Sequence, residues 1–154
     1  MSPREARLLE LGYEIEKTTP EGSLVDAVSI VGDIVYASGQ VPFDGDQLKY
    51  VGVVPSQVSK EDATTAAALC AANVLRAVRK ELGSLEAIKR VVRITGYVRS
   101  EADFSEQHLV INGASQLVRD VFGEAGRHAR TALGMQQLPL GASVEVEMVL
   151  QKKE

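Results

Sequence analysis

The sequence has few residues that bind metals or form covalent links. Its 154 residues include one cysteine, Cys70, and two histidines. A single cysteine excludes an intrachain disulfide and a cysteine-based zinc site, and the two histidines are too dispersed to suggest a metal site. We therefore expect a protein that holds no metal and needs no cofactor.

Long apolar runs are also absent. No stretch approaches the roughly 18 consecutive apolar residues that a membrane-spanning helix needs. Residues 1–5 (MSPRE) contain no apolar core of a signal peptide. The sequence therefore predicts a cytoplasmic protein that does not enter a membrane.

Basic residues are too few for a general nucleic-acid-binding protein. The chain has 17 Lys and Arg against 21 Asp and Glu, and a formal net charge of −4. Nucleic-acid binding depends on clustered Lys and Arg that displace counterions from phosphates. A glycine-rich phosphate loop is also missing, and no elbow motif surrounds Ser38 to make it a triad nucleophile. The composition thus argues against a nucleic-acid partner.

What is present suits one globular domain. Apolar residues make up 45% of the chain and charged residues 25%, which is enough to bury a core. Ser2, Pro3 and Glu5 form a capping-box pattern, which predicts a short helix that stops at Gly12. We expect a single domain over residues 1–154.

Periodic patterns predict an α+β fold. Two apolar runs flank Gly32-Asp33, the pattern of a β-hairpin with a two-residue turn. Ser59 and Gly83 mark the N-cap and the stop of a long helix. The predicted strands are 24–31, 34–37, a weaker 48–53, 88–98, 131–136 and 142–151, and the two predicted longer helices are 60–82 and 105–122. This order predicts a mixed β-sheet with both of these helices packed on one face.

The first long helix carries a stripe of small residues. They recur at spacings of three and four, which lets a helix lie close against a sheet: Ala63, Ala66, Ala67, Cys70, Val74, Ala77 and Val78. We expect Cys70 to pack in the core, since a nucleophilic thiol needs a lowered pKa and access. Asn73 interrupts the apolar pattern, and we expect its amide to bond to backbone.

The residues with the most chemical potential lie near the C-terminus. Residues 144–149 (VEVEMV) alternate, so Glu145 and Glu147 share one strand face and apolar residues share the other. Two acids on the same strand face, with Arg130 upstream, form either a solvated surface or a small polar site. A third reading is an ion pair of Arg130 with one of the two glutamates. The sequence leaves open whether the apolar face packs on the helices or on a neighbouring subunit.

Two separated segments resemble signatures of one family. Residues 35–42 (VYASGQVP) and residues 128–147, with Arg130 fifteen positions before Glu145, are similar in order and spacing to motifs of the reactive-intermediate deaminase family (RidA/YjgF, also labelled endoribonuclease L-PSP). Asn112 falls where that family has a polar residue. The resemblance covers roughly residues 23–150, which makes residues 1–22 an N-terminal extension.

The resemblance implies a chorismate-mutase-like fold assembled as a homotrimer, with sites in the clefts between subunits. It also implies hydrolysis of reactive 2-imino or enamine acids to 2-keto acids and ammonia, as by a 2-iminobutanoate/2-iminopropanoate deaminase. In this comparison Arg130 matches the residue that holds the substrate carboxylate, a task suited to a guanidinium fork. Glu145 matches the catalytic acid that holds the attacking water, with Glu147 the less favoured candidate.

Other matched positions have two interpretations each. Ser38 and Gly39 are expected to border the pocket, where the Ser38 hydroxyl either donates to substrate or makes a strand-end hydrogen bond. Asn112 is either a site residue or a structural amide. His128 either shares the cleft with Arg130 as a proton relay or bonds to backbone at the strand start. We expect Arg127 to be a surface charge.

The sequence departs from the family pattern at several positions. Val25 stands where better-known deaminases carry a pocket tyrosine, and Ala132 where a cysteine is frequent. Ser115 stands where an aromatic residue is usual, and residues 107–112 form a longer segment. A pocket of different shape is therefore expected. The alternative function is a protein that binds or senses a small carboxylate without turning it over, and an RNA-cleaving protein is the least favoured reading.

Overall fold

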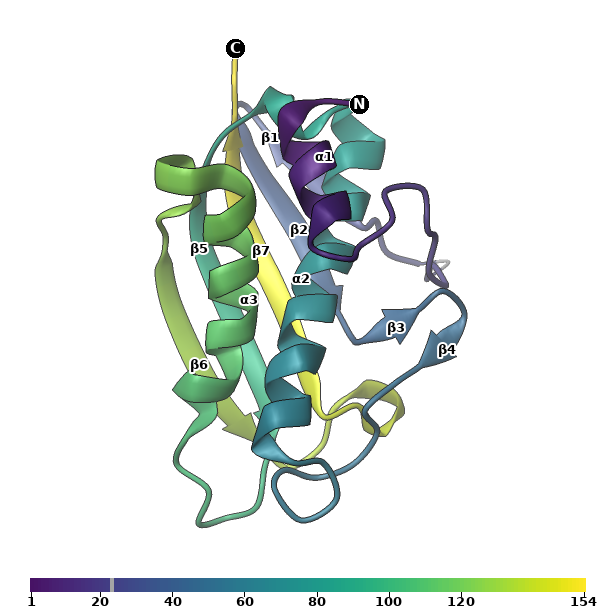
Figure 1. Cartoon of the computed structure of the whole chain (residues 1–154), viewed down its shortest axis with the longest axis vertical. Helices are drawn as coiled ribbons and strands as arrows, with labels where there is room; N and C mark the ends of the chain where they lie inside the picture. Colours follow the sequence, from purple (N-terminus) through teal and green to yellow (C-terminus); the bar gives the residue numbers. More distant parts are fainter. Residues whose placement is uncertain (23) are drawn as a thin grey trace.

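The computed structural model describes residues 1–22 and 24–154 of the chain (Figure 1). In chain order its α-helices and strands are α1 (Pro3–Glu10), β1 (Val28–Val31), β2 (Ile34–Gln40), β3 (Phe43–Asp44), β4 (Gln47–Leu48), α2 (Lys60–Leu82), β5 (Ile88–Arg99), α3 (Gln107–Phe122), β6 (Ala129–Met135) and β7 (Val144–Lys152). Three short 3-10 turns, Leu85–Ala87, Gly123–Gly126 and Pro139–Gly141, join them.

Helices α1 and α2 begin where local signals predict, whereas α3 begins at Gln107, two residues after the predicted start, without a side-chain cap. In α1 the Ser2 side chain accepts from the Glu5 backbone N–H, and the Glu5 carboxylate accepts from the Ser2 backbone, so the predicted capping box is confirmed. Ser59 caps α2 through the Asp62 backbone N–H, and Gly83 ends it with φ of +85°. The predicted bounds of α2 are therefore correct at both ends.

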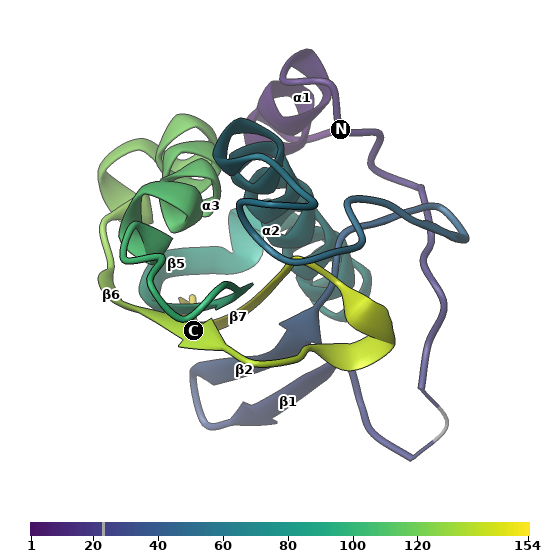
Figure 2. The ribbon, with the colours of Figure 1, turned by 90° about the horizontal axis from the view of Figure 1, so that it is seen from below.

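Five strands form one mixed sheet in the order β1-β2-β7-β5-β6. Strands β5 and β6 pair in parallel, with Ile94 opposite Arg130, and the other pairs are antiparallel. Figure 2 shows the helices on one side of this sheet. Helices α2 and α3 pack against each other and against the strands. The predicted α+β class, with a mixed sheet and two long helices on one face, is confirmed.

One predicted strand is wrong. Residues 48–53 do not form an extended strand, because Tyr50 and Gly52 have φ of +56° and +137°. A two-stranded ribbon, β3 with β4, forms instead around Gly45, whose φ is +65°. The first predicted strand also starts later, at Val28, where pairing with Ala37 begins. These departures reflect backbone turns that an apolar pattern does not reveal.

The side chains of β7 alternate between the sheet face that the helices cover and the face that they leave uncovered. The side chains that alternate toward the helices, Val144, Val146, Met148 and Leu150, are at most 1% exposed. Glu145 and Glu147 therefore face away from the helices and are partly buried. The apolar face of β7 packs inside the chain itself, which decides the question that the sequence left open.

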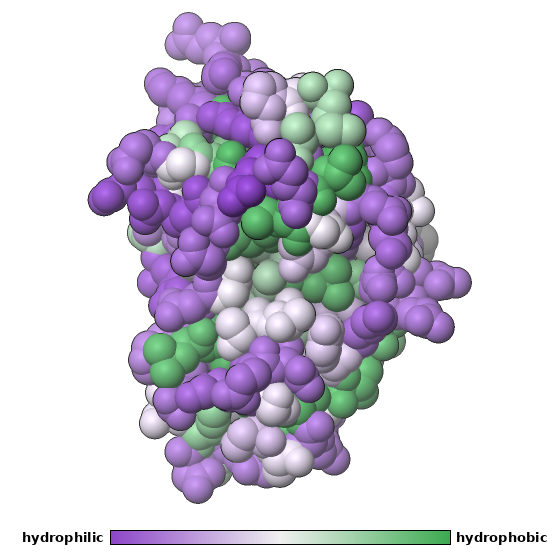
Figure 3. Space-filling model, viewed as in Figure 1, coloured by the Kyte–Doolittle hydropathy of each residue, from purple (hydrophilic) through white to green (hydrophobic). Residues whose placement is uncertain are grey.

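The helix-bearing surface is mostly polar. Figure 3 shows hydrophilic residues around the periphery of this face and smaller hydrophobic patches near its middle. No helix in the described part of the chain is long and apolar enough to cross a membrane.

Candidate functional site

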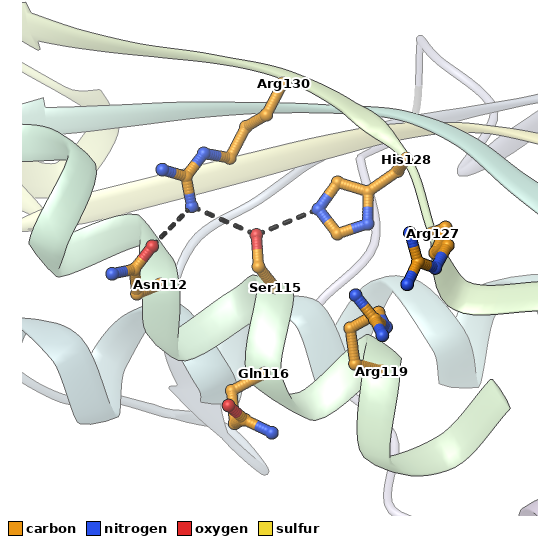
Figure 4. Close-up of a pocket in the computed structure, with 7 residues that line it drawn as sticks. All are labelled: Asn112, Ser115, Gln116, Arg119, Arg127, His128 and Arg130. Atoms are coloured by element: carbon orange, nitrogen blue, oxygen red, sulfur yellow. Dashed lines mark hydrogen bonds between the residues drawn. The ribbon is translucent and has the colours of Figure 1, made fainter. Parts of the chain in front are cut away.

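Arg130 lies on β6 and points toward α3. Its strand partner Ile94 is fully buried beneath the helices, and residues directly paired in parallel strands point to the same face. Nη1 of Arg130 donates to Oδ1 of Asn112 at 2.8 Å and to Oγ of Ser115 at 3.1 Å (Figure 4). Nη2 donates to the His108 carbonyl at 3.2 Å. Asn112 therefore contacts the arginine directly, and α3 fixes the guanidinium.

His128 continues this network. Its Nδ1 lies 2.6 Å from the Gly126 carbonyl, and because a carbonyl only accepts, Nδ1 carries the proton. Nε2, 2.9 Å from Oγ of Ser115, is then the acceptor of the Ser115 hydroxyl in the neutral ring. Hydrogen bonds therefore run from Arg130 to Ser115 to His128. The interpretation that His128 bonds to backbone is confirmed, and the ring also shares the groove with Arg130, while a role as proton relay stays a prediction.

Burial keeps His128 neutral. Desolvation is the largest cause of its lowered pKa, and the charges of Arg130 and Arg119 act in the same direction, against the hydrogen bond to Gly126. Burial likewise lowers the pKa of Arg130, although a guanidinium stays protonated in proteins. At pH 7 the pair thus consists of a charged guanidinium and a neutral imidazole.

An open groove of about 560 Å³ lies between α3 and the start of β6. Its α3 wall is one helix face, with residues at spacings of three and four: Asn112, Ser115, Gln116 and Arg119. The other wall holds Arg127, His128 and Arg130. Among the residues that line this groove there are three arginines and no carboxylate. Arg127 is exposed and pairs with Glu124 at 2.9 Å, so its prediction as a surface charge is confirmed.

A second group of predicted residues gathers on the uncovered face of the sheet. Glu145 lies over Gly39, at an irregularity in the pairing of β2 with β7 between Ala37 and Gln40. A Cβ at position 39 would clash with Oε1 of Glu145 and approach its Cδ to 3.1 Å. Space for the Glu145 carboxylate in this position, and not backbone conformation, therefore favours glycine here. Ser38 donates its hydroxyl to the Asp26 carbonyl at 2.6 Å, which is the strand-end interpretation.

The two glutamates of β7 differ in their surroundings. Glu147 accepts a short hydrogen bond from the Tyr97 hydroxyl, which is the main cause that raises the pKa of Tyr97 to about 12. Glu145 accepts no side-chain hydrogen bond from the described residues. Burial, followed by the charge of Glu147, raises the pKa of Glu145. Glu145 is thus the less constrained of the two acids, and burial favours its protonated form.

Arg130 and Glu145 do not meet within one chain. On β5 their strand partners are Ile94 and Tyr97, which are three positions apart and so point to opposite faces. Over the described residues Arg130 makes no ion pair with Glu145 or Glu147, so the ion-pair interpretation is wrong. The fold therefore separates the predicted residues into an arginine half, with Asn112, and a glutamate half, with Ser38 and Gly39.

Two other predictions concern residues outside both halves. Cys70 is fully buried, and burial raises its pKa well above the usual range, as expected of a core thiol. The Asn73 amide donates to the carbonyls of Val41 and Phe43, so its structural role is confirmed. Within residues 1–22 and 24–154, no three His, Cys, Asp or Glu side chains gather as a metal site would require.

Sequence reasoning missed several residues of the groove. Ser115 drew attention only as a departure from an aromatic position, yet it links Arg130 to His128. Gln116 and Arg119 were not identified, although they follow Asn112 at helical spacings of four and seven. That helical spacing was the signal in the sequence that could have identified these two residues. Val25, at the expected tyrosine position, is 68% exposed, and Ala132 packs against the core.

The fold and the two polar groups define a class of small α+β proteins with a mixed sheet, helices on one face and an arginine on the edge strand β6. Residues 5–151 match the profile of the family described as "YjgF/chorismate mutase-like, putative endoribonuclease". The chain belongs to this family, and the resemblance seen in its sequence is confirmed.

Individual relatives agree with this assignment. Protein TCP17 of Trypanosoma cruzi is 35% identical over 95% of this chain and 92% of its own length. The crystal structure of Atu1372 from Agrobacterium tumefaciens, a protein of unknown function, is 42% identical, with a TM-score of 0.90 over 97% of this chain and 92% of that one. A structure described as a putative endoribonuclease from Shewanella oneidensis MR-1 is 27% identical, with a TM-score of 0.92 over 97% and 99%.

Proposed function

We propose that this protein hydrolyses reactive 2-imino or enamine acids to 2-keto acids and ammonia in clefts between the subunits of a homotrimer. The observation that supports it most is the separation of the two halves on opposite faces of the sheet. A neighbouring subunit can place its Glu145, Ser38 and Gly39 opposite Arg130 and Asn112 of this one. One closed ring then holds three equivalent sites.

Arg130 binds the substrate carboxylate. A guanidinium has five N–H donors, and three of them are used by Asn112, Ser115 and the His108 carbonyl. The two that remain suffice for a bidentate carboxylate contact. The same three protein acceptors hold the guanidinium in one orientation before substrate arrives, which lowers the entropy cost of binding.

Glu145 moves the protons. Water adds through its oxygen to C2 of the imine, while Glu145 accepts a water proton and transfers it to the imine nitrogen. The resulting carbinolamine loses its hydroxyl proton to the same nitrogen as the C2–N bond breaks, leaving the 2-keto acid and ammonia. The raised pKa of Glu145 suits this exchange, since an acid–base group works best when its pKa approaches the working pH.

The first test measures imine decay. 2-Iminopropanoate and 2-iminobutanoate are generated in situ by an amino-acid oxidase, and ammonia release is followed with and without the protein. Accelerated release that disappears in Arg130→Ala supports the deaminase. No acceleration by the folded wild-type protein contradicts it and favours the second candidate, a protein that only binds small carboxylates. The Val25 and Ala132 positions favour that candidate, because neither offers the polar group that the better-known deaminases carry.

A complementation experiment tests the shared cleft. Arg130→Ala and Glu145→Gln are each expected to inactivate every site of their own homotrimer. In a mixed trimer of either composition, one of the three clefts pairs an intact arginine with an intact glutamate. Mixed trimers purified through both tags should therefore have about a third of wild-type activity, and the unpurified random mixture of equal amounts about a quarter. The two chains are co-expressed with different tags and purified through both.

The control is a mixture of two variants that damage the same half, Arg130→Ala with Asn112→Ala, which should gain nothing from mixing. Mixed trimers of the first pair that remain as inactive as their parents would show that the two halves do not act across a subunit boundary.

A further inference from the structure

The arginine groove holds more positive charge than one substrate carboxylate requires. Arg130 occupies one end of it, and Arg119 and Arg127 lie together at the other, with Ser115 and His128 between (Figure 4). No carboxylate lines the groove, and the imidazole that lies between the arginines is neutral. A groove with three guanidinium groups favours an anion with more than one charge.

Arg119 and Arg127 are available to such an anion. Arg119 forms no ion pair or side-chain hydrogen bond with the described residues, and its side chain is exposed. Arg127 pairs only with Glu124, and both side chains are more than half exposed, at 66% and 83%. An exposed pair of this kind contributes little free energy, so a ligand can share or replace it.

Helix geometry sets the distance between the two anionic positions. Ser115, which contacts Arg130, and Arg119 lie four residues apart on α3, which is about one turn or roughly 6 Å along the axis. A four- or five-carbon dicarboxylate spans such a distance. The acids of the opposing half, Glu145 and Glu147, repel a second carboxylate and direct it toward this end of the groove.

We propose that the groove selects substrates with a second anionic group, namely 2-imino dicarboxylates of four or five carbons. Arg130 holds the carboxylate beside the imine, and Arg119 with Arg127 holds the distal one. This inference rests on the proposed function for its chemistry, and on the groove alone for its choice of ligand.

The experiment compares dianionic with monoanionic substrates. 2-Iminosuccinate and 2-iminoglutarate are made from aspartate and glutamate by their oxidases, and 2-iminopropanoate from alanine. The wild-type protein should show a kcat/KM at least about tenfold higher for a dianionic imine. The double variant Arg119→Ala/Arg127→Ala should lower the ratio of dianionic to monoanionic kcat/KM by about tenfold, the lower range for hydrogen bonds to charged groups. Arg7→Ala, at an exposed arginine on α1, is the control for losing a positive charge away from the groove and should leave the ratio unchanged.

A binding measurement separates this inference from the proposed function. Calorimetry compares 2-oxoglutarate with pyruvate on the same variants. A preference for the dianion that the double variant loses supports the groove even if no imine is hydrolysed. Accelerated decay of 2-iminopropanoate without any dianion preference supports the deaminase and overturns the groove. A preference equal in the double variant and in Arg7→Ala also overturns it.

Discussion

Arg130 and Glu145 lie on opposite faces of one sheet, although only β5 separates their strands. Arg130 pairs with Ile94 and Glu145 with Tyr97. Because Ile94 and Tyr97 are an odd number of positions apart on β5, the side chains of Arg130 and Glu145 point to opposite faces. Because strand register is fixed by backbone hydrogen bonds along the whole ladder, no side-chain rotation brings the two together. Any chemistry that uses both residues needs a second subunit.

Replacing Arg130 by lysine should weaken carboxylate binding while the fold survives. Lysine offers a single ammonium and cannot reach Asn112, Ser115, the His108 carbonyl and a ligand at once. We expect Arg130→Lys to raise the Kd for pyruvate about tenfold to a hundredfold, since a charged hydrogen bond contributes about 1.5–3 kcal/mol. Arg7→Lys is the control. An unchanged Kd, measured by calorimetry, would remove Arg130 from the site.

Ser115 should act by positioning Arg130. In Ser115→Ala the guanidinium loses one acceptor and the connection to His128. We expect KM to rise about tenfold with a smaller change in kcat, because a hydrogen bond to a charged group contributes about 1.5–3 kcal/mol and two other acceptors still hold the guanidinium. Ser115→Thr keeps the hydroxyl and should restore KM. Equal KM values in the alanine and threonine variants would show that the hydroxyl has no such role.

The two glutamates of β7 should differ in turnover. Glu145→Gln is expected to keep carboxylate affinity and lower kcat by about a hundredfold or more, the usual contribution of a general acid–base group. In Glu147→Gln the amide oxygen can still accept from Tyr97, so a much smaller loss is expected. Single-turnover rates on a pre-formed imine make the comparison. If Glu147→Gln caused the larger loss, the two roles would be exchanged.

Glu145→Gln should also make the protein more stable at neutral pH. The native state raises the pKa of Glu145 above the ordinary value of 4.5, so it favours the protonated form. Below pH 4.5 the carboxyl is protonated in both native and unfolded states and costs nothing. As pH rises through the native pKa, the wild-type carboxyl ionises where burial disfavours its charge, so the native state loses stability. The glutamine variant does not ionise and keeps its stability. Thermal unfolding at pH 7 and pH 4 should show a higher Tm for Glu145→Gln only at pH 7; a constant difference would contradict the assignment.

Gly39→Ala should displace the Glu145 carboxylate. The added Cβ would clash with Oε1, which is the free end of a flexible side chain, so the backbone need not shift. We expect activity to fall to the level of Glu145→Gln while Tm changes little. Gly32→Ala is a poor control because φ at residue 32 is positive, so Ser29→Ala, at an exposed position on the neighbouring strand β1, serves instead. Full activity in Gly39→Ala would show that this contact does not matter.

The sequence alone determined the elements whose signals are local. The capping residues set both ends of α2, the alternation of residues 144–149 gave β7 its apolar and acidic faces, and the small-residue stripe placed Cys70 in the core. Such signals depend on neighbours within a few residues, where periodicity and hydrogen-bonding capacity are directly readable. The matched motifs also identified Arg130, Asn112, Gly39 and Glu145 as residues to examine.

Only the tertiary structure decided how these residues are grouped. Placing β5 between β6 and β7 put Arg130 and Glu145 on opposite faces, and packing of α3 beside β6 linked Ser115 to His128 and brought Arg119 next to Arg127. The positive φ of Tyr50 likewise ended a strand that apolar residues had suggested. Strand order, register and helix placement arise from contacts between segments far apart in the chain, and a local pattern carries no information about which segments will meet.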